Sequence, residues 1–339
     1  ETHLESLLES ASDPIKQDVI RLAIQLEIPG GGDILARWVN DSNQKSKTRI
    51  DALKLLAQQG DDRLEDLVDE LLAGPHPELR VAAGRVLARQ NPERTADLLI
   101  PIANDSQSMT ERQQTISTLG GLKHPRVDAA ITSWLDQLIA GSFPKELHLD
   151  LIEAAGNRDD LVVGRKFAEY QATLAADDKL ANYRPALHGG NYQRGKDIFV
   201  GHMKVKCIRC HKVRQTGGSA GPELTNTGVQ NSREYLLESI VDPNATIAKG
   251  FETTVIMTED GRIVSGIVQD ENQQRVRLLT PKLKTVDVQI DRINDRFTGK
   301  SAMPEEMGTQ IDMHDLRDLV EFLTTLGRDR QQPAPSGKD

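Results

Sequence analysis

The chain has 339 residues, of which 37% are hydrophobic, 27% are charged and only 4% are aromatic. This length allows two or three domains, and the composition is that of an ordinary globular protein with a core of Leu, Ile, Val and Ala. The net charge of −9 argues against nucleic acid or an anionic membrane surface as partner, and no apolar run reaches the length of about 18 residues that a membrane span needs.

An internal repeat runs through residues 1–185, which we expect to form a helical domain. Four helices are expected to begin at Arg49, Arg80, Arg112 and His148, so that successive starts are 31, 32 and 36 residues apart. Pairs of small or apolar residues follow seven residues after each start: Leu56-Ala57, Leu87-Ala88, Leu119-Gly120 and Ala155-Gly156. Short helices at a period in the thirties predict an α-solenoid of HEAT or related type that serves as a scaffold. We expect the repeated arginines to form hydrogen bonds between repeats.

The only two cysteines stand in the sequence Cys207-Ile208-Arg209-Cys210-His211. This C-x-x-C-H spacing is the attachment pattern of haem c, in which each thiol forms a thioether with a haem vinyl group. The adjacent imidazole then reaches the iron as the proximal ligand. A structural zinc site would need four ligands, and a redox dithiol would leave His211 unexplained. The motif therefore predicts one covalently bound haem c.

The residues on both sides of this motif fit such a site. A short helix is expected over residues 191–199, with Gly195 and Phe199 on one face because they are four residues apart. Gly195 would let another helix approach closely, and Phe199 would pack over the porphyrin edge. After the motif comes a loop over residues 217–224, and we expect one of its carbonyl groups to accept the Nδ1 proton of His211.

The next stretch combines one helix with a β insertion. Residues 232–240 are expected to form a helix with Ser232 as its N-cap, ended by Asp242-Pro243. Runs rich in β-branched residues follow, separated by turns such as Asp260-Gly261: 251–258, 262–269, 275–280 and 285–290. They predict a small antiparallel sheet or barrel of four to five strands at about 250–292. We expect it to be a lid over the haem edge or a packing platform rather than a separate ligand site.

The chain has six methionines, any of which could in principle supply the distal iron ligand. Met303 and Met307 lie in the loop before the last helix, a segment that can fold over a haem face, and Pro304 stiffens the chain beside Met303. We therefore predict Met303 as the ligand, with Met307 as the fallback. An apolar stripe over 311–326 predicts the last helix, with Asp312 as N-cap and Gly327 as its stop. The polar, Pro-rich residues 331–339 are expected to be disordered.

Five features together resemble a class I cytochrome c over about residues 190–327: Gly195-x-x-x-Phe199, Cys207-x-x-Cys210-His211, Gly221-Pro222-x-Leu224, Met303-Pro304 and the last helix. More narrowly, the chain resembles the large planctomycete and verrucomicrobial proteins that carry a haem-binding domain after helical repeats. The resemblance implies a cytochrome c fold at 186–330, with Phe199, Pro222 and Leu224 in the haem pocket. It also implies His/Met ligation, with Met303 as distal ligand. The expected fold class is thus mainly α, an N-terminal HEAT-like solenoid followed by a cytochrome c fold with an inserted β-sheet.

Three functions follow from this interpretation. The first is one-electron transfer by a single His/Met-ligated haem, with a dehydrogenase domain or partner as the donor that the resemblance implies. The second is a haem sensor or enzyme with an open or displaceable distal site, for which His202 and His314 are candidate distal groups. The third is a repeat scaffold whose haem is structural. We favour electron transfer, because both axial positions of the iron would be filled.

The beginning of the chain and the haem chemistry bear on localisation. The chain opens Glu1-Thr2-His3-Leu4, without an initiator Met or a signal peptide, so we expect a processed piece of a longer protein. Covalent haem attachment takes place outside the cytoplasm. We therefore expect a periplasmic or otherwise exported protein, or the soluble part of a larger or membrane-associated one.

Overall fold

The computed structural model describes residues 15, 18, 19, 22 and 30–328. They fall into two compact units: the first comprises the described residues up to Phe143 together with Asp150–Tyr170, and the second comprises Pro144–Leu149 together with the described residues from Gln171 onward. The predicted domain boundary near 185 therefore lies within the second unit. The expected disordered tail, residues 331–339, lies outside the described residues.

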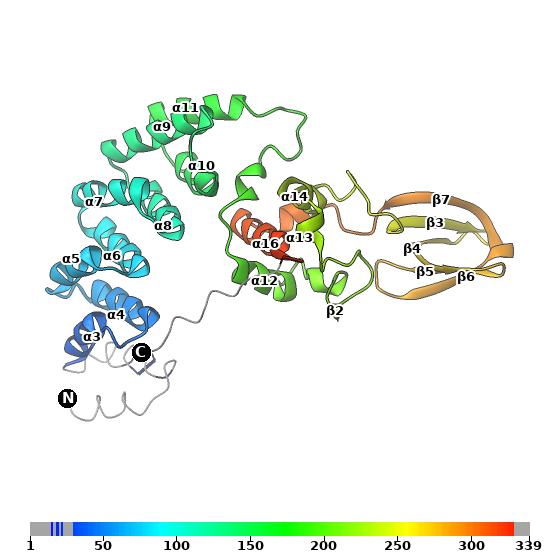
Figure 1. The fold of residues 1–339 in the computed structure, drawn as a ribbon, viewed down its shortest axis with the longest axis horizontal. Helices are drawn as coiled ribbons and strands as arrows, with labels where there is room; N and C mark the ends of the chain where they lie inside the picture. The colour runs from blue at the N-terminus through cyan, green and yellow to red at the C-terminus, as the bar shows by residue number, and fades with distance from the viewer. Residues whose placement is uncertain (1–14, 16–17, 20–21, 23–29, 329–339) are drawn as a thin grey trace. The chain divides into compact units, whose positions relative to one another are not determined.

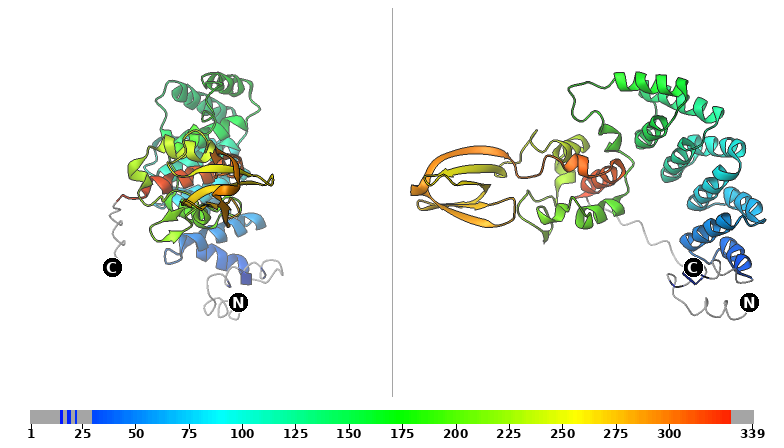
Figure 2. Two further views of the ribbon diagram at one scale, coloured as in Figure 1. Left: turned by 90° about the vertical axis from the view of Figure 1, so that its right-hand side faces the viewer. Right: turned by 180° about the vertical axis from the view of Figure 1, so that it is seen from behind.

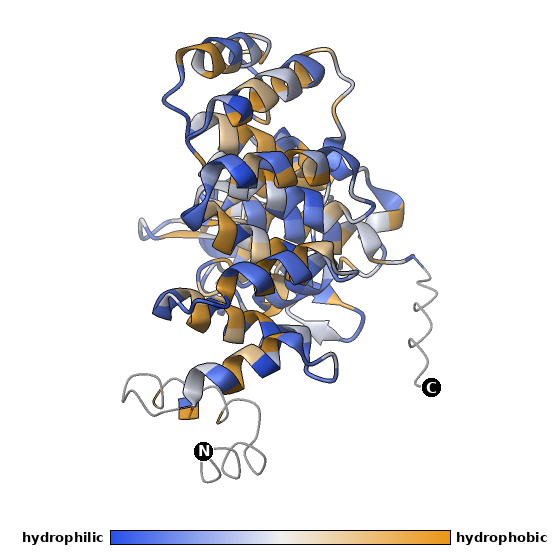
Figure 3. Ribbon diagram, turned by 90° about the vertical axis from the view of Figure 1, so that its left-hand side faces the viewer, coloured by the Kyte–Doolittle hydropathy of each residue, from blue (hydrophilic) through white to orange (hydrophobic). Residues whose placement is uncertain are grey.

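The first unit is a stack of short helices that form a curved array (Figure 1). Prolines stand at the start of α6, α7 and α9, where a missing backbone N–H leaves no hydrogen bond unmade. Every helix combines apolar and polar residues (Figure 3), and most of the helices bury leucine, isoleucine or valine side chains. The helices are α3 (Gly31–Asn40), α4 (Ser46–Gln59), α5 (Leu64–Ala73), α6 (Pro77–Gln90), α7 (Pro92–Asp105), α8 (Met109–Gly120), α9 (Pro125–Ile139), α10 (His148–Gly156) and α11 (Leu161–Ala172).

The repeated arginines join neighbouring helices of this stack, as the sequence predicts. Each guanidinium donates to a main-chain oxygen near the end of the preceding helix: Arg49 to Val39 at 2.7 Å, Arg80 to Gly74 at 2.7 Å and Arg112 to Ala103 at 2.8 Å. These helices begin three residues earlier than expected, so each arginine is the fourth residue of its helix. Helix α10 does begin at His148. The leucines at the repeat position, Leu56, Leu87 and Leu119, are all buried.

Helices of the second unit pack around one apolar core. They are η2 (Arg184–Leu187), α12 (Tyr192–Gly201), η3 (Cys207–Arg209), α13 (Thr227–Gln230), α14 (Arg233–Val241), α15 (Met307–Gln310) and α16 (Met313–Thr325). The predicted N-caps are confirmed: Ser232 accepts from Tyr235 N at 3.1 Å, and Asp312 accepts from Asp315 N at 2.8 Å. Gly327 follows α16 with a φ of +82° and ends it.

Close contact between α12 and α16 depends on Gly195. A Cβ atom on this residue would lie 1.9 Å from the Asp318 carbonyl oxygen, so only glycine lets the two helices approach so closely. The expected role of Gly195 is thereby confirmed. Asp318, which is 1% exposed, accepts from Asn191 N at 2.6 Å and pairs with Arg194 at 2.6 Å, so it ties the start of α12 to α16.

A five-stranded antiparallel sheet follows α14 and is drawn in yellow to orange (Figure 2). Its strands have the spatial order β6-β5-β4-β3-β7. Its strands are β3 (Glu252–Thr258), β4 (Ile263–Glu271), β5 (Arg275–Leu279), β6 (Thr285–Gln289) and β7 (Ile293–Ser301). Ile256, Val276, Leu278 and Val288 form its buried core. Because β7 ends at Ser301, the sheet continues about nine residues beyond the end at about 292 that the sequence predicts. Strand β7 is an edge strand with mostly exposed residues, so it lacks the apolar alternation that reveals the other strands.

None of the helices within the described residues combines the length and the apolar character needed to cross a membrane.

Candidate haem-attachment site

The C-x-x-C-H motif forms a tight turn that opens with η3. Cys210 N and His211 N both donate to the Cys207 carbonyl oxygen, at 3.1 and 2.9 Å. This turn places the two cysteines and the histidine on one short piece of chain, and the loop after them folds back over it. Gly218 N donates to Ile208 O at 2.9 Å, and Gly221 N donates to Cys210 O at 2.8 Å.

Two residues of this loop fix the imidazole of His211. Its Nδ1 lies 3.0 Å from the Pro222 carbonyl oxygen. Since a carbonyl oxygen only accepts, Nδ1 must carry the proton, and Nε2 keeps its lone pair. Gly221 packs directly against the ring, so that a Cβ atom there would be 2.6 Å from Cε1 and 2.8 Å from Nδ1. The loop carbonyl that the sequence leads us to expect is therefore that of Pro222, and Gly221 is a further contact that the sequence does not reveal.

All three side chains of the motif are partly buried. Burial lowers the pKa of His211, although the Pro222 carbonyl acts in the opposite direction, so the ring is neutral at physiological pH. Burial also raises the pKa of the Cys207 thiol to about 11 and raises that of Cys210. Neither cysteine forms a disulfide. The motif thus offers two protonated thiols and a neutral imidazole with a free lone pair.

These groups do not converge on a metal ion by themselves. Within the described residues, His, Cys, Asp and Glu side chains form no group of three or more that could hold one. Two thiols beside one imidazole are the groups that covalent haem attachment would need, the cysteines for its periphery and the histidine for its iron.

Met303 lies on the same apolar core as this motif. Met303, Met307 and Cys207 are all partly buried and pack against the cluster that includes Phe199, Leu236, Ile311 and Leu316. Met303 belongs to the short segment between β7 and α15, whereas Met307 is the first residue of α15. The fold therefore brings the predicted distal ligand and the attachment motif, 92 residues apart in sequence, to one core.

The other predicted pocket residues occupy different places around this core. Leu224 packs against it, and Pro222 supplies the carbonyl that His211 contacts. Phe199 is 2% exposed, and its ring centroid lies 5.4 Å from that of Phe322 on α16. Phe199 is therefore part of the α12–α16 contact, and its contact with a porphyrin edge stays a prediction.

The two alternative distal histidines have other partners. His202 Nδ1 accepts from Val205 N at 3.2 Å, and its Nε2 lies 3.6 Å from an Asp315 carboxylate oxygen. This contact links the end of α12 to the start of α16. His314 Nδ1 lies 3.0 Å from Arg317 Nη2 and accepts from it. A distal role for either histidine stays a prediction.

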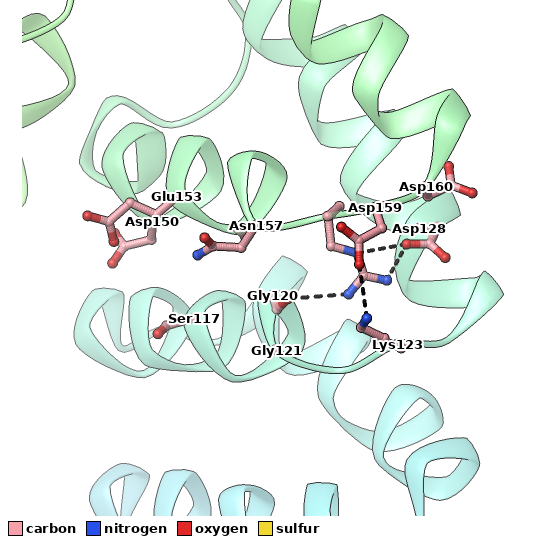
Figure 4. Close-up of a pocket in the computed structure, with 12 residues that line it drawn as sticks. Ser117, Gly120, Gly121, Lys123, Asp128, Asp150, Glu153, Asn157, Asp159 and Asp160 are labelled. Carbon is pink, nitrogen blue, oxygen red and sulfur yellow. Dashed lines mark hydrogen bonds and ion pairs between the residues drawn. The ribbon is translucent and has the colours of Figure 1, made fainter.

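A separate hollow of about 520 Å³ lies in the first unit beside α8 and α10 (Figure 4). Its charged residues largely pair with one another. Lys123 lies 2.9 Å from Asp159, and Arg158 pairs with Asp128 while donating to Leu122 O at 2.6 Å. Gly120 faces Ala154 so closely that a Cβ atom would lie 2.8 Å from the Ala154 Cβ. These contacts join successive repeats. We therefore regard the hollow as a feature of helix packing in the repeats rather than as a ligand site.

Comparison with known proteins supports the repeat architecture. The family model for HEAT repeats matches residues 64–137, which fold as α5 to α9. The helical repeat of the first unit is therefore of the HEAT type, and the chain is mainly helical with a small antiparallel sheet. No curated protein sequence matches this chain.

Proposed function

We propose that the second unit is a class I cytochrome c domain that binds one haem c and transfers single electrons. The observation that carries this proposal is the state of His211, whose ring is held by Pro222 and Gly221 with the Nε2 lone pair available for a metal. Cys207 and Cys210 would each form a thioether, in which Sγ bonds to one vinyl carbon and the thiol hydrogen passes to the other. The haem would supply one-electron redox chemistry.

Met303 is proposed as the distal ligand. A thioether sulfur is a soft ligand that favours ferrous iron and so raises the reduction potential, which suits a domain that accepts electrons. If His211 and Met303 both held the iron, no position would be open for a substrate. This is why we propose electron transfer rather than gas sensing or peroxidase chemistry.

The proposed redox partner approaches the basic segment, residues 204–214. This segment carries five cationic side chains and no acidic one: Lys204, Lys206, Arg209, Lys212 and Arg214. None of the five forms an ion pair within the part of the chain that the structure describes. Met203 beside them is 92% exposed. In a chain of net charge −9, this concentration of unpaired cations around the motif favours a partner with an acidic surface, such as a dehydrogenase domain or protein.

The HEAT repeats are proposed to act as the scaffold that carries this domain. Because covalent haem attachment takes place outside the cytoplasm, we also propose that the protein is exported.

The attachment claim is tested by replacing both thiols. The Cys207→Ala/Cys210→Ala protein, produced together with a haem c maturation system, should release all its haem into acid acetone, whereas the unaltered protein should retain it on a denaturing gel. Met203→Ala is the matched control, because Met203 is exposed and only four residues from Cys207; it should retain haem. Haem retained by the double variant, or absent from the unaltered protein, would overturn the proposal.

A further inference from the structure

The segment that carries Met303 is tethered at both ends by one side chain. Asn244 lies in the connection between α14 and β3, far from this segment in sequence. Its Oδ1 accepts from Ser301 N at 2.9 Å, and its Nδ2 donates to Glu305 Oε1 at 2.8 Å. Asn244 thus spans the Met303 segment, residues 301–305, with Met303 at its centre.

The sheet fixes the upstream end of the same segment. Strand β7 ends at Ser301, which pairs with Glu252 of β3. Beside this pair, Thr253 Oγ1 donates to the Lys300 carbonyl oxygen at 2.6 Å, and a Cβ atom on Gly299 would lie 2.3 Å from that hydroxyl. These contacts hold the irregular pairing between Thr298 and Ser301, which ends only two residues before Met303.

The downstream end is fixed against α14. Gly308 in α15 lies so close to α14 that a Cβ atom there would be 3.2 Å from the Cα atom of Val241. Val241, Asn244 and Glu252 belong to one stretch of chain that runs from α14 into β3. The Met303 segment is therefore held, before and after the methionine, by a single continuous support.

A hydrogen bond within the segment also restrains the backbone of Met303 itself. Ser301 Oγ accepts from Met303 N at 3.2 Å, so the backbone of Met303 is linked to the same residue that Asn244 binds. Thioethers are weak ligands of iron and need such preorganisation, because an unrestrained loop would lose conformational entropy each time the sulfur binds.

We infer that Asn244 is a positioning residue for the distal ligand, and that the β insertion serves to anchor the Met303 segment. This inference rests on the proposed haem function and assigns a role to the insertion. It explains why a sheet separates the two axial ligands: β3 supports the segment from one side while β7 leads directly into it.

The test uses the haem-loaded full chain with Asn244→Ala. Loss of the two hydrogen bonds should raise the fraction of protein with Met303 released by roughly ten- to thirtyfold. The rate of CO binding to the reduced protein should rise by about the same factor, the weak absorption band at roughly 700 nm should fade, and the reduction potential should drop. Haem should stay covalently bound.

Two further variants separate positioning from general damage. Asn244→Asp keeps the acceptor for Ser301 N but places a carboxylate beside that of Glu305. We therefore expect its CO binding to be as fast as that of Asn244→Ala. Adding Glu305→Gln should restore the slow CO binding, because the introduced amide can donate to the new carboxylate. The Glu305–Lys300 ion pair that is lost is exposed and contributes little.

Asn191→Ala is the matched control. Asn191 caps α12 by accepting from Arg194 N at 2.9 Å, and its loss should destabilise the unit without changing CO binding. Unchanged CO binding and an unchanged potential in Asn244→Ala, with haem covalently bound, would refute the positioning role and leave the proposed function intact. An equal change in Asn191→Ala would refute it as well. Absence of covalent haem from the unaltered chain would instead refute the proposed function.

Discussion

At the scale of single residues, the state of His211 is set by neighbours that have no titratable side chain. The Pro222 carbonyl oxygen at 3.0 Å selects the tautomer, and the absence of a Cβ atom on Gly221 makes room for the ring. A backbone carbonyl holds the proton on Nδ1 at any pH at which the ring is neutral, so the lone pair of Nε2 stays available.

Gly221→Ala should displace the imidazole, because the added methyl group would lie 2.6 Å from Cε1. We expect the free energy of unfolding to fall by about 1–3 kcal/mol. The haem should stay covalently attached through Cys207 and Cys210, while its absorption spectrum shifts towards a high-spin or mixed form. Gly201→Ala is the control, because nothing lies within 4 Å of a Cβ atom there. Identical spectra and stabilities of the two variants would contradict the contact.

Sequence reasoning proposes the groups that would carry chemistry, and it also anticipates the loop carbonyl beside His211, but it misses Gly221 and Asn244. Cys207, Cys210 and His211 lie within five consecutive residues, so their spacing alone is enough to predict haem attachment. Asn244 lies 57 residues before Ser301, and no local pattern marks an asparagine that will bond to a distant backbone. Gly221 likewise looks like an ordinary turn residue until the ring is seen beside it.

At the scale of secondary-structure elements, the HEAT repeats are joined by a buried ion pair. Arg80 on α6 donates to both carboxylate oxygens of Glu111 on α8, at 2.7 and 2.8 Å, and the Glu111 side chain is fully buried. A buried carboxylate left without its partner is costly, more so than the pair itself is stabilising.

Arg80→Ala should therefore lower the free energy of unfolding of the first unit by roughly 3 kcal/mol. Arg89→Ala on the same helix is the control, since that side chain is exposed, and it should change the free energy by less than about 0.5 kcal/mol. Thermal or denaturant unfolding followed by circular dichroism measures both. Equal stability of the two variants would show that Glu111 does not depend on Arg80.

The helices and most strands are predictable because their apolar side chains recur at the spacing typical of a helix or a strand. The period of the repeat, the N-caps Ser232 and Asp312 and the turn at Asp260-Gly261 are all local signals. Strand β7 is the exception, because it lies at the edge of the sheet and most of its residues are exposed. Its pairing with β3 is a tertiary contact that hydrophobic alternation does not encode.

At the scale of the whole molecule, charge is distributed unevenly. The chain carries a net charge of −9, yet the basic segment at 204–214 has five cations and no acid. Such a local field raises the rate of encounter with anions and does so most at low ionic strength.

Charge reversal tests whether this segment is where electrons leave or enter. Lys204→Glu/Lys206→Glu should slow the oxidation of the reduced protein by ferricyanide at least about threefold at low salt, and the difference should vanish at high salt. Lys282→Glu/Lys284→Glu in the turn between β5 and β6 makes the same change in net charge at another exposed site. If both double variants slow the reaction equally, net charge alone governs it and the basic segment has no special role.

The most direct test of the central claim is an absorption spectrum of the purified, haem-loaded protein, oxidised and then reduced. Ligation by His211 and Met303 predicts sharp α and β bands on reduction and a weak band at roughly 700 nm in the oxidised form that Met303→Ala abolishes. A high-spin spectrum that changes at once on addition of CO would contradict it, since the iron would then have an open site.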